Sequence, residues 1–118
     1  MIHIDIGRSP GGRIRSFSSE GHADYSNKGS DIICAAVSIL VINTVNSLEA
    51  LLPEDAREMK VEVDEKGRIA CAFEKEPSEK AGILLDAMYL GLKDVYREYG
   101  GRYIEIAEKK EENGYDQA

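Results

Sequence analysis

The sequence is poor in the residues that build metal sites and disulfide frameworks. Its 118 residues include two cysteines, two histidines and no tryptophan. The cysteines and histidines do not cluster at the spacing of a structural zinc site, and two thiols are too few for a disulfide-stapled secreted domain. We therefore expect no metal and no cofactor, and two reduced thiols without a Cys34–Cys71 disulfide.

Basic charge and long apolar runs are also scarce. Lys and Arg number 15 against 22 Asp and Glu, which gives a formal net charge of −7. Direct nucleic-acid binding is not expected, because a protein that neutralises phosphates needs a basic surface. The most apolar stretch, 32–42, is shorter than the roughly 20 residues that cross a bilayer. The amino terminus also lacks the pattern of a signal peptide, so we expect a cytoplasmic location and no membrane partner.

The charge that is present is unevenly distributed. Residues 1–52 are nearly neutral and contain both histidines and Cys34, whereas residues 53–118 carry most of the negative excess. The length fits a single domain. We assign residues 1–106 to that domain and residues 107–118 to a polar, flexible carboxy-terminal tail.

Hydrophobic periodicity predicts five strands and two helices. Alternating apolar residues predict a strand hairpin over 1–19, with a bulge in its second strand, a second hairpin over 59–73, and a short last strand at 103–106. Helical spacing predicts helices over 32–52 and from 77 to 99, the second ended by Gly100. The order β-β-α-β-β-α-β predicts an α+β fold in which a mixed sheet carries two helices.

The first predicted helix is apolar nearly all round at its start. We therefore expect its first three turns to be deeply buried. The residues expected on its core face are Ile33, Ala36, Val37, Leu40, Val41, Thr44, Leu48 and Leu51.

A polar, glycine-bounded loop precedes this helix and is longer than a plain connection needs. Ser30 and Asp31 are both good N-cap residues, which places Cys34 in the first helical turn. Unpaired backbone N–H groups and the helix dipole favour a thiolate there. If the loop folds back, His22 can reach the sulfur, and a Cys–His pair is an activated nucleophile.

Two further residues lie near Cys34 along the helix. Asp31 and Ser38 project from roughly the same side of the helix as Cys34, and either can orient the imidazole or bind substrate. Each residue also has a simpler interpretation. A free cysteine in an apolar helix is usually a small core residue, Asp31 is an ordinary N-cap, and Ser38 can bond to its own backbone. Cys71, in the middle of a strand, is expected in the core.

The same residues resemble a known family. The segments Gly21-His22-Ala23 and Gly29-Ser30-Asp31-Ile32-Ile33-Cys34-Ala35-Ala36-Val37-Ser38 are similar to the motifs of the ribosomal-processing cysteine protease family, called Prp. The opening strand pair, the length and the late helix followed by Gly-Gly also fit, so that the resemblance covers roughly residues 1–106.

The resemblance implies a set of roles for this chain. Cys34 would be the nucleophile and His22 the catalytic histidine, with Asp31 and Ser38 in supporting roles. Members of the family remove a short N-terminal extension from a protein of the large ribosomal subunit, in the cytoplasm and typically as homodimers. The loop that would admit the peptide substrate contributes Gly21, Ala23, Asp24, Tyr25, Gly29 and Ser30.

Two functions therefore compete. The first is a cysteine endopeptidase that uses a Cys34–His22 dyad. The second is a non-catalytic, ribosome-associated binding module in which Cys34 belongs to the core and the loop is a docking surface. A thiol redox sensor is a weaker third possibility, because Cys71 is expected to be too buried to act as a resolving partner.

Overall fold

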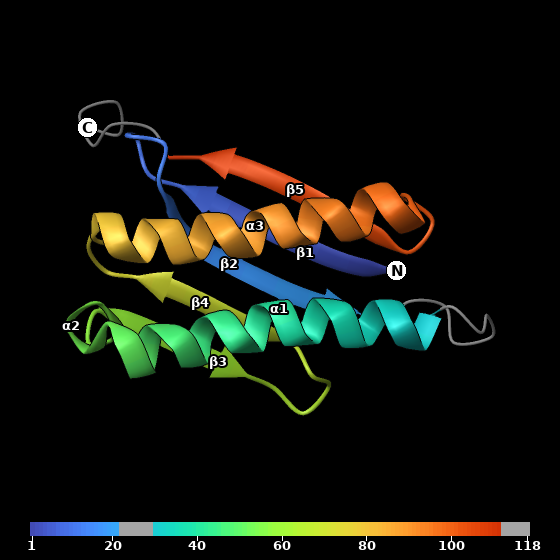
Figure 1. Ribbon diagram of the computed structural model, residues 1–118, viewed down its shortest axis with the longest axis horizontal. Coiled ribbons are helices and arrows are strands. Elements are labelled where there is room, and N and C mark those ends of the chain that lie inside the picture. The colour runs from blue at the N-terminus through green and yellow to red at the C-terminus, as the bar shows by residue number, and fades with distance from the viewer. Residues whose placement is uncertain (22–29, 112–118) are drawn as a thin grey trace.

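A single five-stranded sheet forms the frame of the molecule (Figure 1). The computed structural model describes residues 1–21 and 30–111, leaving aside the side chains of Ser30 and Asp31. The strands are β1 (Ile2–Arg8), β2 (Ile14–Gly21), β3 (Met59–Val63), β4 (Ile69–Phe73) and β5 (Ile104–Lys110). They lie in the order β3-β4-β2-β1-β5, and only the β1–β5 pair is parallel. The mixed sheet confirms the predicted α+β class.

Helices cover one face of this sheet: α1 (Ser30–Leu51), the single turn α2 (Pro53–Ala56) and α3 (Glu79–Tyr99). Ser78 caps α3, since its hydroxyl accepts the N–H of Ala81 at 3.2 Å. Gly100 ends the same helix at a φ of +81°, which a residue with a side chain rarely adopts. The short α2 was not predicted. It follows directly on α1 because a proline, unable to continue a helix, is well suited to begin one.

The hairpin of β1 and β2 contains the predicted bulge. Alternate isoleucines of β1 face the core, as the period of two requires. The register then shifts between Gly7 and Arg8, where Gly7 pairs with Ser16 but Arg8 pairs with Ile14. This shift explains why Ile14 and Phe17 are out of phase in the sequence although both are buried.

The last strand is longer than predicted. β5 continues to Lys110, pairing with β1 along its whole length, so residues 107–110 do not belong to a tail. Glu108 stabilises this extension by accepting hydrogen bonds from Tyr89 Oη at 2.6 Å and from Arg8 Nε at 3.0 Å. The hydrogen bond from Tyr89, together with Arg8, lowers the pKa of Glu108. Residues 112–118 lie outside the described part of the chain.

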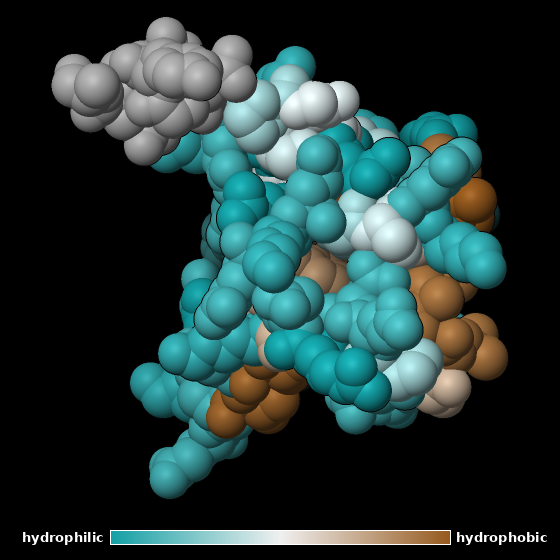
Figure 2. Space-filling model, turned by 90° about the vertical axis from the view of Figure 1, so that its left-hand side faces the viewer, coloured by the Kyte–Doolittle hydropathy of each residue, from teal (hydrophilic) through white to brown (hydrophobic). Residues whose placement is uncertain are grey.

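Only the inner face of α1 is buried. Its core residues are Ile33, Val37, Val41, Thr44, Val45 and Leu48. The expected deep burial of the first three turns is wrong, because Ile32 is 60% and Ile39 is 66% exposed. Leu51, also expected in the core, is 66% exposed. In the part of the chain that the structure describes, the helices form a single layer with no further element over their outer side, and apolar side chains gather on that side in Figure 2.

The length of the apolar part of α1 corrects the expectation, drawn from 32–42 alone, that no segment is long enough to cross a bilayer. Within the described residues, the segment Ile32–Leu51 is the one helix long and apolar enough to cross a membrane, judged by length and composition. A helix in the core of a folded domain satisfies the same criterion, and the inner face of α1 packs against the sheet.

Candidate active site

The site begins where β2 ends, at Gly21. Its backbone has a φ of +90°, and a Cβ at this position would collide with the carbonyl oxygen of Met1. Both constraints require glycine. Gly21 therefore lets β2 finish against the start of β1 and sends the chain on toward α1. His22 is the next residue in the sequence.

Close packing against α3 fixes the position of α1. Gly91 of α3 faces Leu40 of α1, and a Cβ on Gly91 would lie 2.7 Å from Leu40 Cδ2. The absence of that side chain allows the two helices to approach closely. Because β2 ends beside the first residue of β4, the amino-terminal end of α1 lies at the end of the sheet that carries the β3–β4 turn.

Cys34 is the fifth residue of α1, because the helix begins at Ser30. The helix thus includes Ser30 and Asp31, whose capping roles stay predictions because the structure does not describe their side chains. Cys34 opens the second turn instead of lying in the first. Its side chain is half-buried and packs against the edge of the core, and its thiol is free. An accessible thiol close to a helix amino terminus can act as a nucleophile, with first-turn N–H groups nearby as donors.

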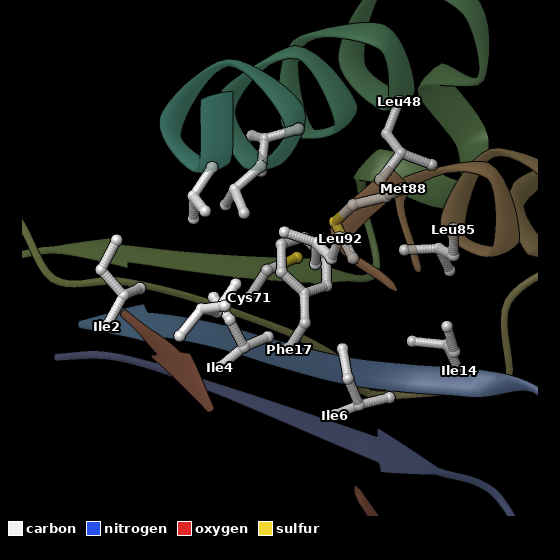
Figure 3. Packing of buried hydrophobic residues seen from close by; sticks show 14 of the residues in the cluster. Ile2, Ile4, Ile6, Ile14, Phe17, Leu48, Cys71, Leu85, Met88 and Leu92 are labelled. Carbon is white, nitrogen blue, oxygen red and sulfur yellow. The ribbon is translucent and has the colours of Figure 1, made fainter. Parts of the chain in front are cut away.

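Cys71 has the opposite surroundings. It is 2% exposed in the middle of β4, and Figure 3 shows its side chain among Phe17, Ile4 and Leu92. Burial, and to a smaller extent the charge of Glu49, raises the pKa of Cys71 to about 12. This thiol is protonated at any physiological pH and inaccessible, which confirms its expected place in the core.

The structure describes only part of the predicted site. His22, Ala23, Asp24, Tyr25 and Gly29 lie outside the described residues, as do the side chains of Ser30 and Asp31. Ser38 is described and is exposed, one turn beyond Cys34. Within residues 1–21 and 30–111, no group of three or more His, Cys, Asp or Glu side chains is arranged to hold a metal ion.

Comparison with known proteins identifies the class of protein. The family model for the cysteine protease Prp matches residues 1–105. A Bacillus subtilis (strain 168) protein named ribosomal processing cysteine protease Prp is 30% identical over 104 residues, which are 84% of this chain and 90% of the relative. A Staphylococcus aureus protein of the same name is 27% identical over 100 residues, covering 84% of this chain and 92% of the relative.

Solved structures agree with this match. The S. aureus Prp structure with a covalently linked product peptide has a TM-score of 0.79 and 26% identity, and covers 92% of this chain and 100% of that chain. A second S. aureus Prp structure, with a substrate peptide, has the same TM-score and 25% identity, over the same shares of the two chains.

The chain belongs to the Prp family of cysteine proteases. It is thus an enzyme that acts on peptides, and the non-catalytic binding module is set aside. Of the two thiols, only Cys34 combines accessibility with a position near a helix start. The hairpin at 59–73 was interpreted from its sequence as part of the sheet only. That β3 is an edge strand beside α1 could not be inferred from it, because strand order depends on pairings between distant segments.

Proposed function

We propose that this enzyme is an endopeptidase that removes a short N-terminal extension from a protein of the large ribosomal subunit, using a Cys34–His22 dyad. The observation that carries the assignment of the nucleophile is the contrast between the half-buried Cys34 on α1 and the buried, protonated Cys71. The names of the relatives support the substrate class.

The first half of the reaction forms a thioester. The Cys34 thiolate attacks the scissile carbonyl carbon, and backbone N–H groups in the first turn of α1 donate to the oxyanion. The C–N bond then breaks as the His22 imidazolium gives its proton to the leaving nitrogen. The new amino terminus departs, and the segment on the other side of the cleaved bond stays attached to the sulfur.

Hydrolysis completes the cycle. Water adds to the thioester carbonyl as His22 takes one of its protons, and the carbon–sulfur bond breaks. This step releases the extension as a carboxylic acid, which loses its proton to the solvent, and restores the Cys34 thiolate and the His22 imidazolium. Asp31 and Ser38 orient the imidazole or the substrate, and the loop from Gly21 to Ser30 orders around the bound peptide.

The test is cleavage of a synthetic peptide that spans the extension junction, followed by mass spectrometry. We expect one cleavage, abolished in Cys34→Ala and in His22→Ala and retained in Cys71→Ala. Cys34→Ser should also be nearly inactive, because a hydroxyl is much harder to ionise than a thiol. Full cleavage by Cys34→Ala would refute the assignment of the nucleophile.

We also propose that the enzyme acts in the cytoplasm as a homodimer. Four large apolar side chains on the outer sides of α1 and α3 are 58–66% exposed: Ile32, Ile39, Ile83 and Leu90. An apolar face of this kind favours association. Sedimentation velocity of the wild type and of Ile39→Glu tests the dimer, and a monomer at all concentrations would contradict it.

A further inference from the structure

The two edges of the sheet differ in the backbone groups they offer. In the β3–β4 pair, Glu74 N–H donates to the Glu58 carbonyl at 2.9 Å and Asp64 N–H donates to the Arg68 carbonyl at 3.0 Å. Hydrogen-bonded and non-hydrogen-bonded pairs alternate along an antiparallel ladder. The even-numbered residues of β3 therefore face β4, and the odd-numbered ones, Met59, Val61 and Val63, direct their N–H and C=O groups outward.

The side chains of these outward-facing residues are also unusual for a sheet edge. Met59 and Val61 are half-buried, and Val63 is 68% exposed. Edge strands are commonly protected from pairing by charged residues. The residues of β5 that direct their backbone outward include Glu108 and Lys110, whereas the outward row of β3 carries no charge. The charged residues of β3, Lys60 and Glu62, lie on the other face of the strand by alternation, so the face that carries Met59, Val61 and Val63 is the less protected of the two edges.

A hollow of about 490 Å³ lies between this edge and the helices. Met59 and Val61 from β3 and Pro53 and Ala56 from α2 give it an apolar lining, and two charged residues, Glu49 of α1 and Arg57, complete it. Figure 2, seen from the end at which α2 lies, shows an open notch with apolar side chains on its sheet side. The hollow can therefore receive apolar side chains from a strand laid along β3.

The hollow and the thiol lie on the same side of α1. Cys34 and Glu49 are fifteen residues apart, which at ~3.6 residues per turn leaves their side chains about 60° apart around the helix axis, on the same flank of α1. Their separation is about 22 Å at a rise of ~1.5 Å per residue. An extended chain of about seven residues spans that length. Since the amino-terminal end of α1 lies toward the end of β3 that carries Val63, such a chain runs from the hollow past Val63 to Cys34.

We propose that the peptide substrate binds as an added strand on the free edge of β3, with apolar side chains entering the hollow beside α2. The backbone groups of Val61 and Val63 then fix the register of the peptide, and the hollow selects apolar residues several positions from the bond that Cys34 attacks. This inference rests on the proposed nucleophile, because the added strand would have to reach Cys34 for its scissile bond to be attacked. The occupant is an extended, apolar segment of the substrate.

Val63→Pro tests the inference by removing one outward N–H without breaking a bond to β4. Lys110→Pro is its matched control. Ile2 N–H donates to the Tyr103 carbonyl and Glu111 N–H donates to the Arg8 carbonyl, so the even residues of β5 face outward on the opposite edge. With a peptide that the wild type cleaves in a Cys34-dependent manner, we expect kcat/KM to fall about tenfold or more in Val63→Pro and to stay unchanged in Lys110→Pro.

A second measurement does not depend on how the proline is tolerated. In full-length Cys34→Ala protein, amide exchange by NMR should slow at Val61 and Val63 when the same peptide is added. Lys60 and Glu62, already bonded to β4, serve as internal references. Unchanged exchange at Val61 and Val63, or cleavage unaffected by Val63→Pro, overturns the strand addition while leaving the nucleophile in place.

Pairing of β3 with β3 of a second copy would use the same outward N–H and C=O groups. The same experiments distinguish this pairing from peptide binding. It would protect Val61 and Val63 in the absence of peptide, and Val63→Pro would lower the association state in sedimentation velocity. That outcome overturns the inference. Failure of the wild type to cleave any junction peptide would instead refute the proposed function.

Discussion

The start of α1 and the centre of the sheet differ in how far they bury a cysteine thiol. Cys34 lies half-buried near a helix amino terminus, where backbone N–H groups favour negative charge. Cys71 lies among isoleucine and aromatic side chains, and burial raises its pKa to about 12. Cysteine is thus a candidate nucleophile at the start of α1 and a buried core residue in the sheet. If Cys34 serves catalysis and Cys71 serves stability, changes at the two thiols should affect different properties of the protein.

The largest expected effect is on catalysis. Cys34→Ala should reduce kcat/KM at least about 10³-fold, because the nucleophile is lost. Its unfolding free energy should change by less than about 1 kcal/mol, since the side chain is only half-buried. Cys71→Ala should do the reverse, with nearly wild-type activity and a loss of about 1 kcal/mol in stability. Peptide cleavage and urea unfolding of both variants measure the contrast, and an inactive but stable Cys71→Ala would break it.

The second effect is on alkylation. Iodoacetamide should modify Cys34 at least about 10²-fold faster than Cys71 at neutral pH, because the Cys71 thiol is both protonated and inaccessible. In urea the two rates should converge. Peptide mapping by mass spectrometry after timed quenching gives both rates from one sample. Equal labelling in the folded protein would contradict the assignment of Cys71 to the core.

The third effect is the response of stability to alkaline pH. The unfolded chain loses the Cys71 proton above a pKa of about 8.5, whereas the folded protein keeps it up to about 12. The unfolded state therefore binds fewer protons, and stability falls as the pH rises through this window. The slope from this one group approaches about 1.4 kcal/mol per pH unit. Urea unfolding of the wild type and of Cys71→Ala, measured between these two pKa values, isolates the contribution of Cys71. All other groups titrate in both proteins and cancel in the difference.

The smallest effect concerns Ser38. It is exposed one turn beyond Cys34, so Ser38→Ala should change the unfolding free energy by less than about 0.5 kcal/mol. If the hydroxyl orients substrate or imidazole, kcat/KM should fall by a few-fold, as for the loss of one hydrogen bond. Steady-state kinetics on the junction peptide provide the measurement. Wild-type kinetics would remove Ser38 from the site and leave Gly21 and Cys34 as its described members.

Local features of the chain were predicted well because short-range physics decides them. The bulge in the first hairpin and the glycine end of α3 at Gly100 each follow from a few neighbouring residues. The core position of Cys71 follows from strand alternation between Ile69 and Phe73. The helix that carries Cys34 was predicted for the same reason, although α1 begins two residues earlier than predicted.

Features that depend on distant pairing were missed or misjudged. The length of β5 could not be predicted because its last residues are polar, and they are held by pairing with β1 and by Tyr89 and Arg8. The outer face of α1 was expected to be buried because Ile32 and Ile39 are apolar. Periodicity gives the direction of a side chain but does not reveal how many layers of structure lie beyond it.

The sequence by itself determined the class of fold, the two classes of cysteine environment and the helix that carries Cys34, because propensity, alternation and helix termini are local properties. Only the tertiary structure decided that β3 is an edge strand and that the residues directing their backbone groups outward, Met59, Val61 and Val63, are uncharged. It also placed the hollow beside β3 on the same flank of α1 as Cys34. These facts arise from the strand order and from the packing of a single layer of helices. They depend on contacts between residues far apart in the chain, which no local pattern encodes.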